Sequence, residues 1–253
     1  MRSARYAGMF YPNDPDELKD MIDGFLKNVD HKRNSIDGEL KAIIVPHAGY
    51  VFSGQTAAYA YDLVPKTTRR VFLIGPSHYI PSPGIASSST DWQTPLGSVK
   101  IKPLENDLVR IDDLPHEKEH SLEVQLPFLQ YVLGSDIEVT MLAVNETDVK
   151  SAAQMLNGLL NKDTLLVVST DLSHFYDERA AWQLDGKTSE DIVSKKSASL
   201  PYDEACGLEG IKIVVELASM NDWTIKELDR STSAKTTGDR RRVVGYGSFA
   251  VFK

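Results

Sequence analysis

Runs of consecutive apolar residues recur along the chain, and the segments between them carry apolar residues three or four positions apart. Unbroken runs of this length are typical of strands buried on both faces of a sheet. They predict strands at 41–45, 71–74, 137–144 and 164–170, shorter strands with turns between 85 and 101, and a closing pair at 223–229 and 243–252. The spaced segments predict helices at 55–63, 105–111, 119–133, 148–160, 176–184, 188–199 and 209–220.

The first helix of the chain has a clear start signal. Asp14 is followed by Pro15 and, three residues after the aspartate, by Glu17. These residue types favour the cap, the first helical position and the first turn of a helix. We expect this helix to run through Val29. Pro127 lies inside a later predicted helix, where it predicts a kink or a restart.

The order of these elements predicts the fold class. Strands alternate with helices along the whole chain, and no repeat, low-complexity tract or long linker divides it. This alternation is typical of a sheet with helices on both faces. We therefore expect a single α/β domain over residues 1–253, with a central, mostly parallel (mixed) sheet.

Composition narrows the range of functions. The 253 residues include 28 Lys and Arg against 36 Asp and Glu, a formal net charge of −8, which disfavours binding to nucleic-acid phosphates. Cys206 is the only cysteine, so no disulfide can form within the chain, and nothing indicates an oxidising compartment. No apolar run is long enough for a signal-peptide core or a membrane-spanning helix. We expect a cytoplasmic protein that binds neither nucleic acid nor membrane.

Three of the six histidines follow the ends of predicted strands. They are His47 in "VPHAGYVFSG", His78 in "GPSH" and His174 in "DLSHF", the last together with Asp171. The carboxyl ends of parallel strands form one edge of such a sheet, and ligands bind at that edge. We therefore predict that these side chains share one site.

Two kinds of chemistry fit this cluster. Neutral imidazole nitrogens bind iron, copper or zinc, and a metal held by two histidines and a carboxylate keeps positions open for oxygen or substrate. A third, unligated imidazole can then move protons near neutral pH. Alternatively, the cluster is a metal-free acid–base site.

A competing motif lies at 116–120. The sequence "HEKEH" matches the H-E-x-x-H pattern of zinc peptidases, with His116 and His120 as ligands and Glu117 as base. Its context is poor, because it follows "DDLP" at the very start of a predicted helix and its filler residues are charged. A contribution of Glu119 or His120 to the edge of the histidine site stays open.

The single cysteine has two interpretations. Cys206 precedes a glycine at the expected start of a helix, and a helix N-terminus can lower the pKa of a thiol. A buried structural cysteine is the commoner case, and we expect that role here.

Several motifs together resemble those of the Memo family (Mediator of ErbB2-driven cell motility), called system protein B in archaeal and bacterial sequences. The segments "PHAGYVFSG", "GPSH", "EHSLEVQLPFLQ", "STDLSH", "CGLEGI" and "VVGYGS" occur in the family's order and span nearly the whole chain. The resemblance implies a fold similar to that of class III, non-haem-iron extradiol dioxygenases, a central mixed sheet flanked by helices.

The resemblance also implies roles for individual residues. His47 and His78 correspond to the two metal-binding histidines, and His174 corresponds to the acid–base histidine that faces the metal. Asp171 and His120 fall at positions that the family groups around the same pocket.

One departure from the family concerns the third metal ligand. Vertebrate members place a cysteine near the C-terminus, whereas counting back from "VVGYGS" gives Thr236 or a neighbour, and Cys206 is assigned to a different motif. No glutamate stands out for a facial triad. A site without a thiolate is poorly suited to Cu(I). We therefore expect weak iron or copper binding, with open positions taken by water, substrate or a carboxylate such as Asp171.

Three functions are compatible with these features. The leading hypothesis is a Memo-family, dioxygenase-like oxidoreductase that uses iron or copper on an unidentified small-molecule or peptide-linked substrate. The second is a non-catalytic module that binds a peptide or metabolite and keeps a vestigial metal site. The third is a zinc hydrolase at "HEKEH".

Overall fold

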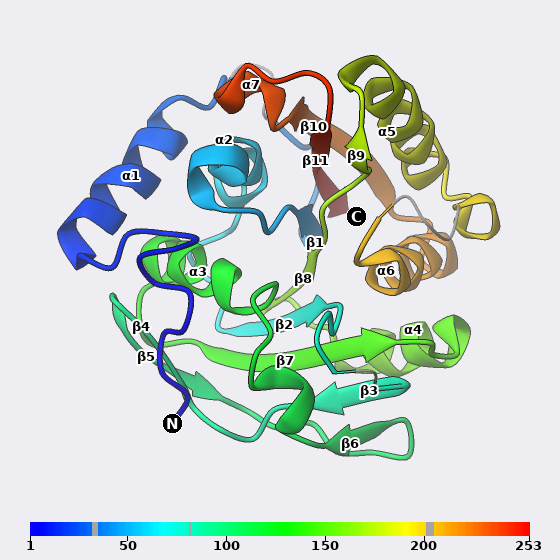
Figure 1. Ribbon diagram of the computed structural model, residues 1–253. Coiled ribbons are helices and arrows are strands. Elements are labelled where there is room, and N and C mark those ends of the chain that lie inside the picture. Colours follow the sequence, from blue (N-terminus) through cyan, green and yellow to red (C-terminus); the bar gives the residue numbers. More distant parts are fainter. Residues whose placement is uncertain (32–34, 81, 201–204) are drawn as a thin grey trace.

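One sheet forms the centre of the computed structural model, which describes residues 1–31, 35–80, 82–200 and 205–253. The strands are β1 (Leu40–Val45), β2 (Arg70–Gly75), β3 (Gly84–Ser87), β4 (Trp92–Thr94), β5 (Gly97–Ile101), β6 (Val109–Ile111), β7 (Glu138–Asn145), β8 (Thr164–Ser169), β9 (His174–Tyr176), β10 (Thr224–Thr232) and β11 (Val243–Phe252). Within the described ranges, the main path of the sheet runs in the order β10-β11-β1-β8-β2-β7-β3-β6 (Figure 1).

The four central strands of the sheet are parallel. β1 pairs with β8, β8 with β2, and β2 with β7, all in the same direction. β11 runs antiparallel between β1 and β10, and β3 runs antiparallel to β7. The short β9 pairs with β11, and the β4–β5 hairpin joins the sheet where β5 pairs with β7. The sheet is therefore mixed with a parallel centre, as the sequence predicts.

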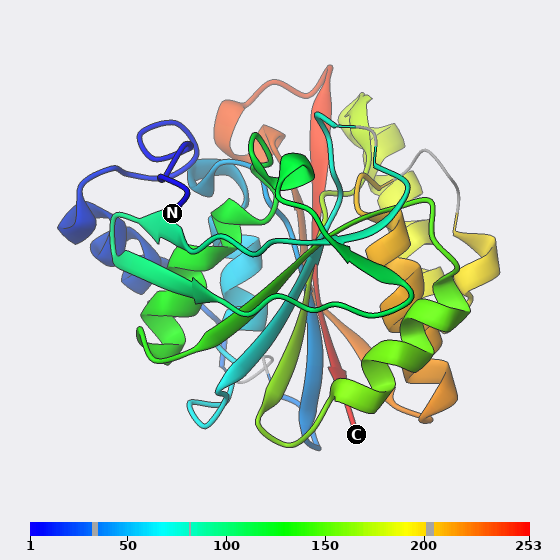
Figure 2. The ribbon, with the colours of Figure 1, turned by 90° about the horizontal axis from the view of Figure 1, so that it is seen from below.

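Helices cover both faces of the sheet. They are α1 (Pro15–Lys27), α2 (Tyr50–Tyr61), α3 (Leu126–Leu133), α4 (Val149–Leu159), α5 (Glu178–Val193), α6 (Leu208–Met220) and α7 (Ala234–Thr237), with 3-10 turns at Leu114–His116, Glu123–Gln125 and Ser197–Ser199. Figures 1 and 2 show α1, α2 and α3 on one side of the sheet and α4, α5 and α6 on the other. No helix in the described ranges is long and apolar enough to cross a membrane.

The unbroken apolar run of β1 is explained by these two layers. Ile43 and Val45 belong to the hydrophobic core under α1, α2 and α3, whereas Ala42 and Ile44 belong to the core under α4 and α6. All four side chains are fully buried. A strand that is buried on both faces has no position for a polar residue, which is why the sequence shows no alternation there.

Two local predictions about helix starts are confirmed. The Asp14 carboxylate caps α1 by accepting hydrogen bonds from the backbone N–H groups of Asp16 and Glu17. The predicted restart near Pro127 is also present, because a 3-10 turn precedes α3 and the proline lies in the first turn of that helix. Proline is tolerated there because the first N–H groups of a helix have no partner within it.

The helix predicted at 105–111 is wrong. The Asn106 side chain accepts hydrogen bonds from the backbone N–H groups of Leu108 and Val109, which makes a turn in place of a helix. The next residues then form β6, which pairs with β3. Pairing with a distant strand has overridden the local helical pattern.

The two helices predicted at 176–184 and 188–199 are one helix, α5, preceded by β9. Gly186 lies in the middle of it. A Cβ atom at this position would lie 2.8 Å from Nη1 of Arg230, so the glycine admits the arginine side chain against the helix. Glycine here reflects close packing and does not interrupt the helix.

Candidate metal centre

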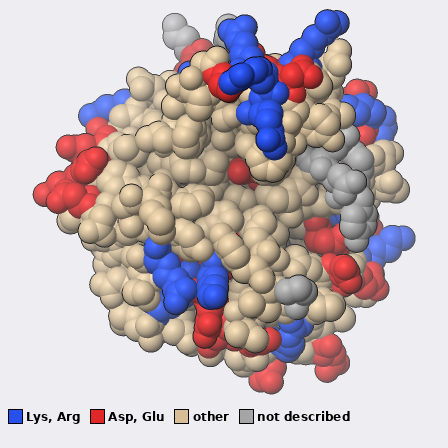
Figure 3. Space-filling view, viewed as in Figure 1, with Lys and Arg blue, Asp and Glu red and all other residues tan. Residues whose placement is uncertain are grey.

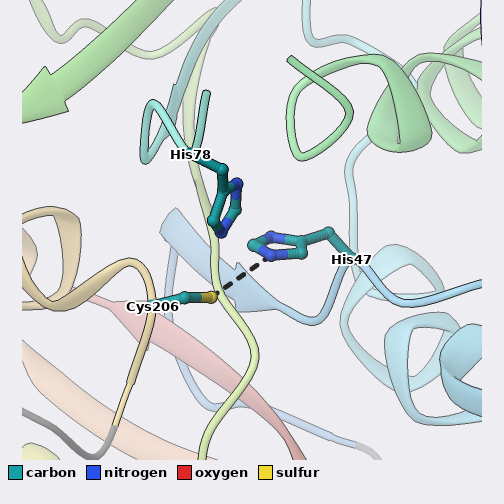
Figure 4. A group of neighbouring side chains, drawn as sticks. All are labelled: His47, His78 and Cys206. Carbon is teal, nitrogen blue, oxygen red and sulfur yellow. Dashed lines mark hydrogen bonds between the residues drawn. The ribbon is translucent and has the colours of Figure 1, made fainter. Parts of the chain in front are cut away.

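The carboxyl ends of β1, β8 and β2 lie at one edge of the sheet because these strands are parallel neighbours. His47 lies two residues after β1, Asp171 two residues after β8, and His78 three residues after β2. The rings of His47 and His78 are nearly perpendicular, with their centroids 5.3 Å apart. Figure 4 shows both rings pointing toward Cys206, which the sequence interpretation placed elsewhere.

Ser169, the last residue of β8, fixes the tautomer of His47. The serine hydroxyl donates to the carbonyl oxygen of Ser121 at 2.7 Å and accepts from the side-chain amide of Gln125 at 2.8 Å. Because its only proton is used, the His47 Nδ1 atom, 3.0 Å away, must donate to it. Burial, and next the charge of His78, lower the pKa of His47 to about 3. The ring is therefore neutral with a free lone pair on Nε2.

The main chain of His47 is held by Asp171. The aspartate is 5% exposed, and its Oδ1 atom accepts a hydrogen bond from the His47 backbone N–H at 2.8 Å. Burial raises the pKa of Asp171 above its ordinary value. Asp171 thus connects the loops that follow β1 and β8, in the neighbourhood that the sequence predicts.

His78 is oriented in a similar way by Glu119. The Nδ1 atom of His78 lies 2.9 Å from Oε1 of Glu119, and the glutamate is fully buried. Burial acts to raise the pKa of Glu119, but the hydrogen bond and charge of His78 outweigh it and lower that pKa to about 2. An ionised carboxylate has no proton to donate, so Nδ1 of His78 is the donor.

Cys206 completes the group. Its Sγ atom lies 3.2 Å from Nε2 of His47 and accepts a hydrogen bond from the backbone N–H of Asp171, also at 3.2 Å. Burial, and next the Asp171 carboxylate, raise the pKa of the thiol above its ordinary value. The protonated thiol therefore donates to the free nitrogen of His47.

The sequence interpretation placed Cys206 outside the site, and this geometry corrects that placement. Gly207 is the reason that the cysteine reaches the histidines, since a Cβ atom there would lie 2.7 Å from the Ser169 carbonyl oxygen. Thr236, the position considered from the sequence, instead donates its hydroxyl to the carbonyl oxygen of Val51 at 3.0 Å. The signal that was available is the single Cys-Gly pair directly before α6.

The three side chains fit a transition metal. One ligand atom from each of His47, His78 and Cys206 lies within 4.8 Å of the other two. Metal bonds of about 2.0–2.3 Å to nitrogen and sulfur bring ligand atoms to within about 4 Å of one another, so small side-chain shifts suffice. Both Nδ1 atoms are occupied by protein acceptors, which is the usual arrangement around metal-binding histidines. Two imidazoles and a thiolate suit copper, zinc or iron.

His120 is the third imidazole in ring contact with this pair. Its centroid lies 5.3 Å from that of His47 and 4.7 Å from that of His78. Burial, and next the charge of His47, lower the pKa of His120 to about 4, so the ring is neutral at pH 7. His174, on β9, affects the pKa values of both His47 and Asp171 through its charge. Its predicted acid–base role stays a prediction.

The "HEKEH" segment does not have the geometry of a zinc helix. It begins at the end of a 3-10 turn and continues without α-helical structure, so its histidines are not one α-helical turn apart. His116 is 1% exposed, lies beside Trp92, and has its Nε2 atom 3.0 Å from the carbonyl oxygen of Ala86. His120 instead contacts His47 and His78.

A cavity of about 390 Å³ opens beside the candidate metal centre. Its lining includes Ser77, His78, Asn145, Glu146, Cys206 and Glu209. Figure 3 shows this edge of the sheet as a largely uncharged surface with a hollow near its centre, while Lys and Arg side chains project from the upper rim. The size is that of a pocket for a small molecule or a few residues of a peptide.

Comparison with protein families gives a match over almost the whole chain. The family described as Memo-like protein matches residues 2–250. Among curated proteins, a MEMO1 family protein of Methanopyrus kandleri is 33% identical over 275 residues, covering 98% of this chain and 97% of the relative. A MEMO1 family protein of Nitrosopumilus maritimus is 30% identical over 271 residues and covers 98% of each chain.

Among solved structures, an uncharacterized protein of Escherichia coli K12 has a similar fold. The TM-score is 0.50 with 11% sequence identity, and the match covers 84% of this chain and 100% of the other. At this identity the likeness concerns the fold alone. It agrees with the single α/β domain described above.

Proposed function

Because the chain belongs to the Memo-like protein family, we propose that it binds one copper or iron ion through His47, His78 and Cys206 and acts as an oxidoreductase. The observation that carries this proposal is the 3.2 Å approach of the Cys206 sulfur to the His47 Nε2 atom, in a site where both histidines already donate their other nitrogen to protein acceptors. A soft thiolate beside two imidazoles restores the case for copper that an all-nitrogen site lacks.

Bound copper or iron would supply one-electron chemistry at this edge of the sheet. With three protein ligands, a coordination position remains for a substrate that enters the cavity beside His78. His120 is neutral at pH 7 and its ring contacts both proposed ligand histidines, but its lowered pKa makes it a weak base, so we assign it the role of packing against their rings. We assign His174 the proton-transfer role and Asp171 the role of holding the His47 main chain.

A second candidate function is a non-catalytic module that binds a peptide or metabolite. Exposed aromatic side chains near the site favour it, since Tyr79 is 48% exposed and Phe175 is 64% exposed. Aromatic rings at the rim of a pocket supply contact area to a ligand whether or not the site is catalytic. In this function the metal would orient the ligand or be dispensable.

Elemental analysis of protein purified without a chelator or a metal-binding tag tests the proposal. We expect close to one copper or iron per chain in the wild type after reconstitution under reducing conditions, and loss of that metal in Cys206→Ser and His47→Ala. His31→Ala is the matched control, because His31 is a solvent-exposed histidine that pairs with Asp62 outside the site. Equal metal content in wild type and Cys206→Ser would contradict the proposal and favour the binding module.

A further inference from the structure

Glu119 is a fully buried carboxylate next to the candidate metal centre that accepts several hydrogen bonds. Its Oε2 atom accepts the backbone N–H of His78 at 2.6 Å. Its Oε1 atom accepts Nδ1 of His78 at 2.9 Å and the backbone N–H of Ser121 at 2.9 Å, and lies 3.4 Å from Nδ1 of His120. One side chain therefore joins the loop after β2 to the 119–121 segment and reaches two imidazoles.

The orientation of His78 depends on this carboxylate acting only as an acceptor. Three N–H groups converge on its two oxygens, and each needs a lone pair. While Glu119 has no proton, Nδ1 of His78 carries the ring proton and Nε2 presents its lone pair to the centre. An imidazole free in water prefers the opposite tautomer, with the proton on Nε2, so the glutamate selects the metal-binding form.

We propose that Glu119 is a positioning residue of the metal centre, which holds His78 in the Nδ1–H tautomer with Nε2 directed toward Cys206 and His47. This inference rests on the proposed metal site for its consequence in affinity, but its statement about the tautomer of His78 concerns the metal-free protein. Sequence reasoning left the role of this residue open.

Glu123 supplies a matched control on the same segment. It is also fully buried, but its Oε1 atom accepts the Tyr11 hydroxyl at 2.6 Å and the Tyr6 backbone N–H at 2.8 Å, and Oε2 pairs with Arg2. None of these partners is a histidine. Replacing Glu123 by Gln thus removes a buried charge of the same kind without removing the acceptor of His78.

The decisive comparison is Glu119→Gln against Glu123→Gln. A glutamine has one oxygen where three N–H groups need acceptors, so its amide –NH₂ must face either a main-chain donor or His78 Nδ1. In the second case the ring has to accept at Nδ1 and moves its proton to Nε2. We expect Glu119→Gln to shift His78 toward the Nε2–H tautomer and to weaken Cu(I) binding about 10–100-fold. Glu123→Gln should leave the tautomer of His78 unchanged and the Cu(I) affinity within about twofold of wild type, while it lowers thermal stability.

Three measurements on each protein carry the test. Long-range ¹H–¹⁵N correlation spectra of the metal-free protein report the tautomer of His78, assigned with His78→Ala. Competition with a colorimetric Cu(I) chelator reports affinity, and circular dichroism melts report whether each variant folds. A wild-type His78 in the Nε2–H form would overturn the inference even if Glu119→Gln did not fold. Unchanged tautomer and affinity in a folded Glu119→Gln protein would overturn it as well.

The same data separate the two proposals. A tautomer change in Glu119→Gln together with absence of Cu(I) and Fe(II) binding by the wild type would support the positioning role and refute the proposed metal function. Wild-type metal binding that is unaffected by Glu119→Gln would refute the positioning role and leave the metal function standing.

Discussion

The Nε2 atom of His47 lies 3.2 Å from the Sγ atom of Cys206, although 159 positions separate the two residues in the sequence. In the metal-free protein this contact is a hydrogen bond in which the thiol donates to the imidazole. A copper or iron ion would be bound by these same two atoms. It would therefore take the place of the thiol proton that lies between them.

That exchange predicts how metal binding depends on pH. Because burial raises the pKa of the Cys206 thiol, the metal-free site carries this proton throughout the neutral range, and each bound ion must release it. One released proton corresponds to a tenfold loss of affinity per pH unit, so we expect about a 100-fold weaker Cu(I) binding at pH 5.5 than at pH 7.5. Calorimetric titration at both pH values in two buffers of different ionisation enthalpy measures affinity and proton release together. Affinity independent of pH would exclude the thiol as a ligand.

Replacing Ser169, which accepts the hydrogen bond from His47 Nδ1, should weaken metal binding although the three proposed ligands remain. In Ser169→Ala the Nδ1 atom of His47 has no serine oxygen to donate to, and the ring loses both its orientation and its preferred tautomer. We expect about 10–100-fold weaker Cu(I) binding. Ser248→Ala is the control, because Ser248 is an equally buried serine of β11 whose hydroxyl has no hydrogen-bond partner among the residues that the structure describes. Equal affinities in the two variants would contradict the role of Ser169.

The close packing around Gly207 predicts that one added methyl group lowers the free energy of unfolding and weakens metal binding. In Gly207→Ala the new Cβ would lie 2.7 Å from the Ser169 carbonyl oxygen, so the Cys206 loop must move away from β8. We expect a stability loss of about 1–3 kcal/mol in urea unfolding together with weaker metal binding. Gly158→Ala in α4 is the matched control, since no atom of the described part of the chain lies within 4 Å of its new Cβ. That variant should gain about 0.5–1 kcal/mol from helix propensity. A neutral Gly207→Ala would show that the close approach is not essential.

Asp113 lies away from the metal centre. Its hydrogen bonds predict that the free energy of unfolding depends on pH. Its carboxylate accepts hydrogen bonds from the hydroxyl of Ser88, the backbone N–H and hydroxyl of Ser89, and the hydroxyl of Thr90. Burial acts to raise the pKa of Asp113, but these hydrogen bonds outweigh it and hold that pKa well below the ordinary range. A depressed pKa stabilises the fold above the unfolded value of about 3.9, and the contribution is lost as the pH falls through the folded pKa.

We therefore expect Asp113→Asn to lower the free energy of unfolding by about 1–2 kcal/mol at pH 7, and by progressively less below about pH 4. Urea unfolding between pH 7 and pH 2.5 measures this. Asp107→Asn, at an exposed position of the neighbouring loop, is the control. A difference between wild type and Asp113→Asn that stays constant down to pH 2.5 would refute the assigned cause.

The position of His116 predicts that this histidine matters for stability and not for metal binding. His116→Ala removes a buried ring beside Trp92 and should lower the free energy of unfolding by about 2–4 kcal/mol. It should leave the amount of bound copper or iron per chain unchanged. His78→Ala should remove the bound metal, and it should also lower stability because the buried Glu119 carboxylate loses the ring as a partner. Zinc that is bound by the wild type and lost in His116→Ala would revive the hydrolase hypothesis.

Elements built from long apolar runs were predictable from the sequence, and so was the edge of the sheet at which the site lies. β1, β2, β7 and β8 are buried on both faces, and strands of this kind show as short, nearly continuous apolar runs in the sequence. His47 and His78 were found because each directly follows such a strand. β6 was not predictable from its own residues, because it forms by pairing with β3. The place of Gly186 inside α5 was not predictable either, because it reflects packing against Arg230.

The third potential ligand was missed for a related reason. Cys206 follows no strand, and it approaches β8 only because Gly207 leaves room for the Ser169 carbonyl oxygen. That contact is a property of the packing between α6 and the sheet, which local sequence patterns do not encode. The motif "CGLEGI" contains this cysteine, but counting back from the C-terminal strand pointed to Thr236, which hydrogen-bonds to Val51 instead.

The position of β1 in the sheet sets the order of events during synthesis. This strand, which leads to His47, pairs on one side with residues 164–169 and on the other with residues 243–252. Contacts between such distant segments form slowly, since long loops must close first. A chain still on the ribosome cannot complete the sheet around this histidine until both partners have left the exit tunnel. An ion held by His47 would then be bound only after residues 243–252 have joined the sheet.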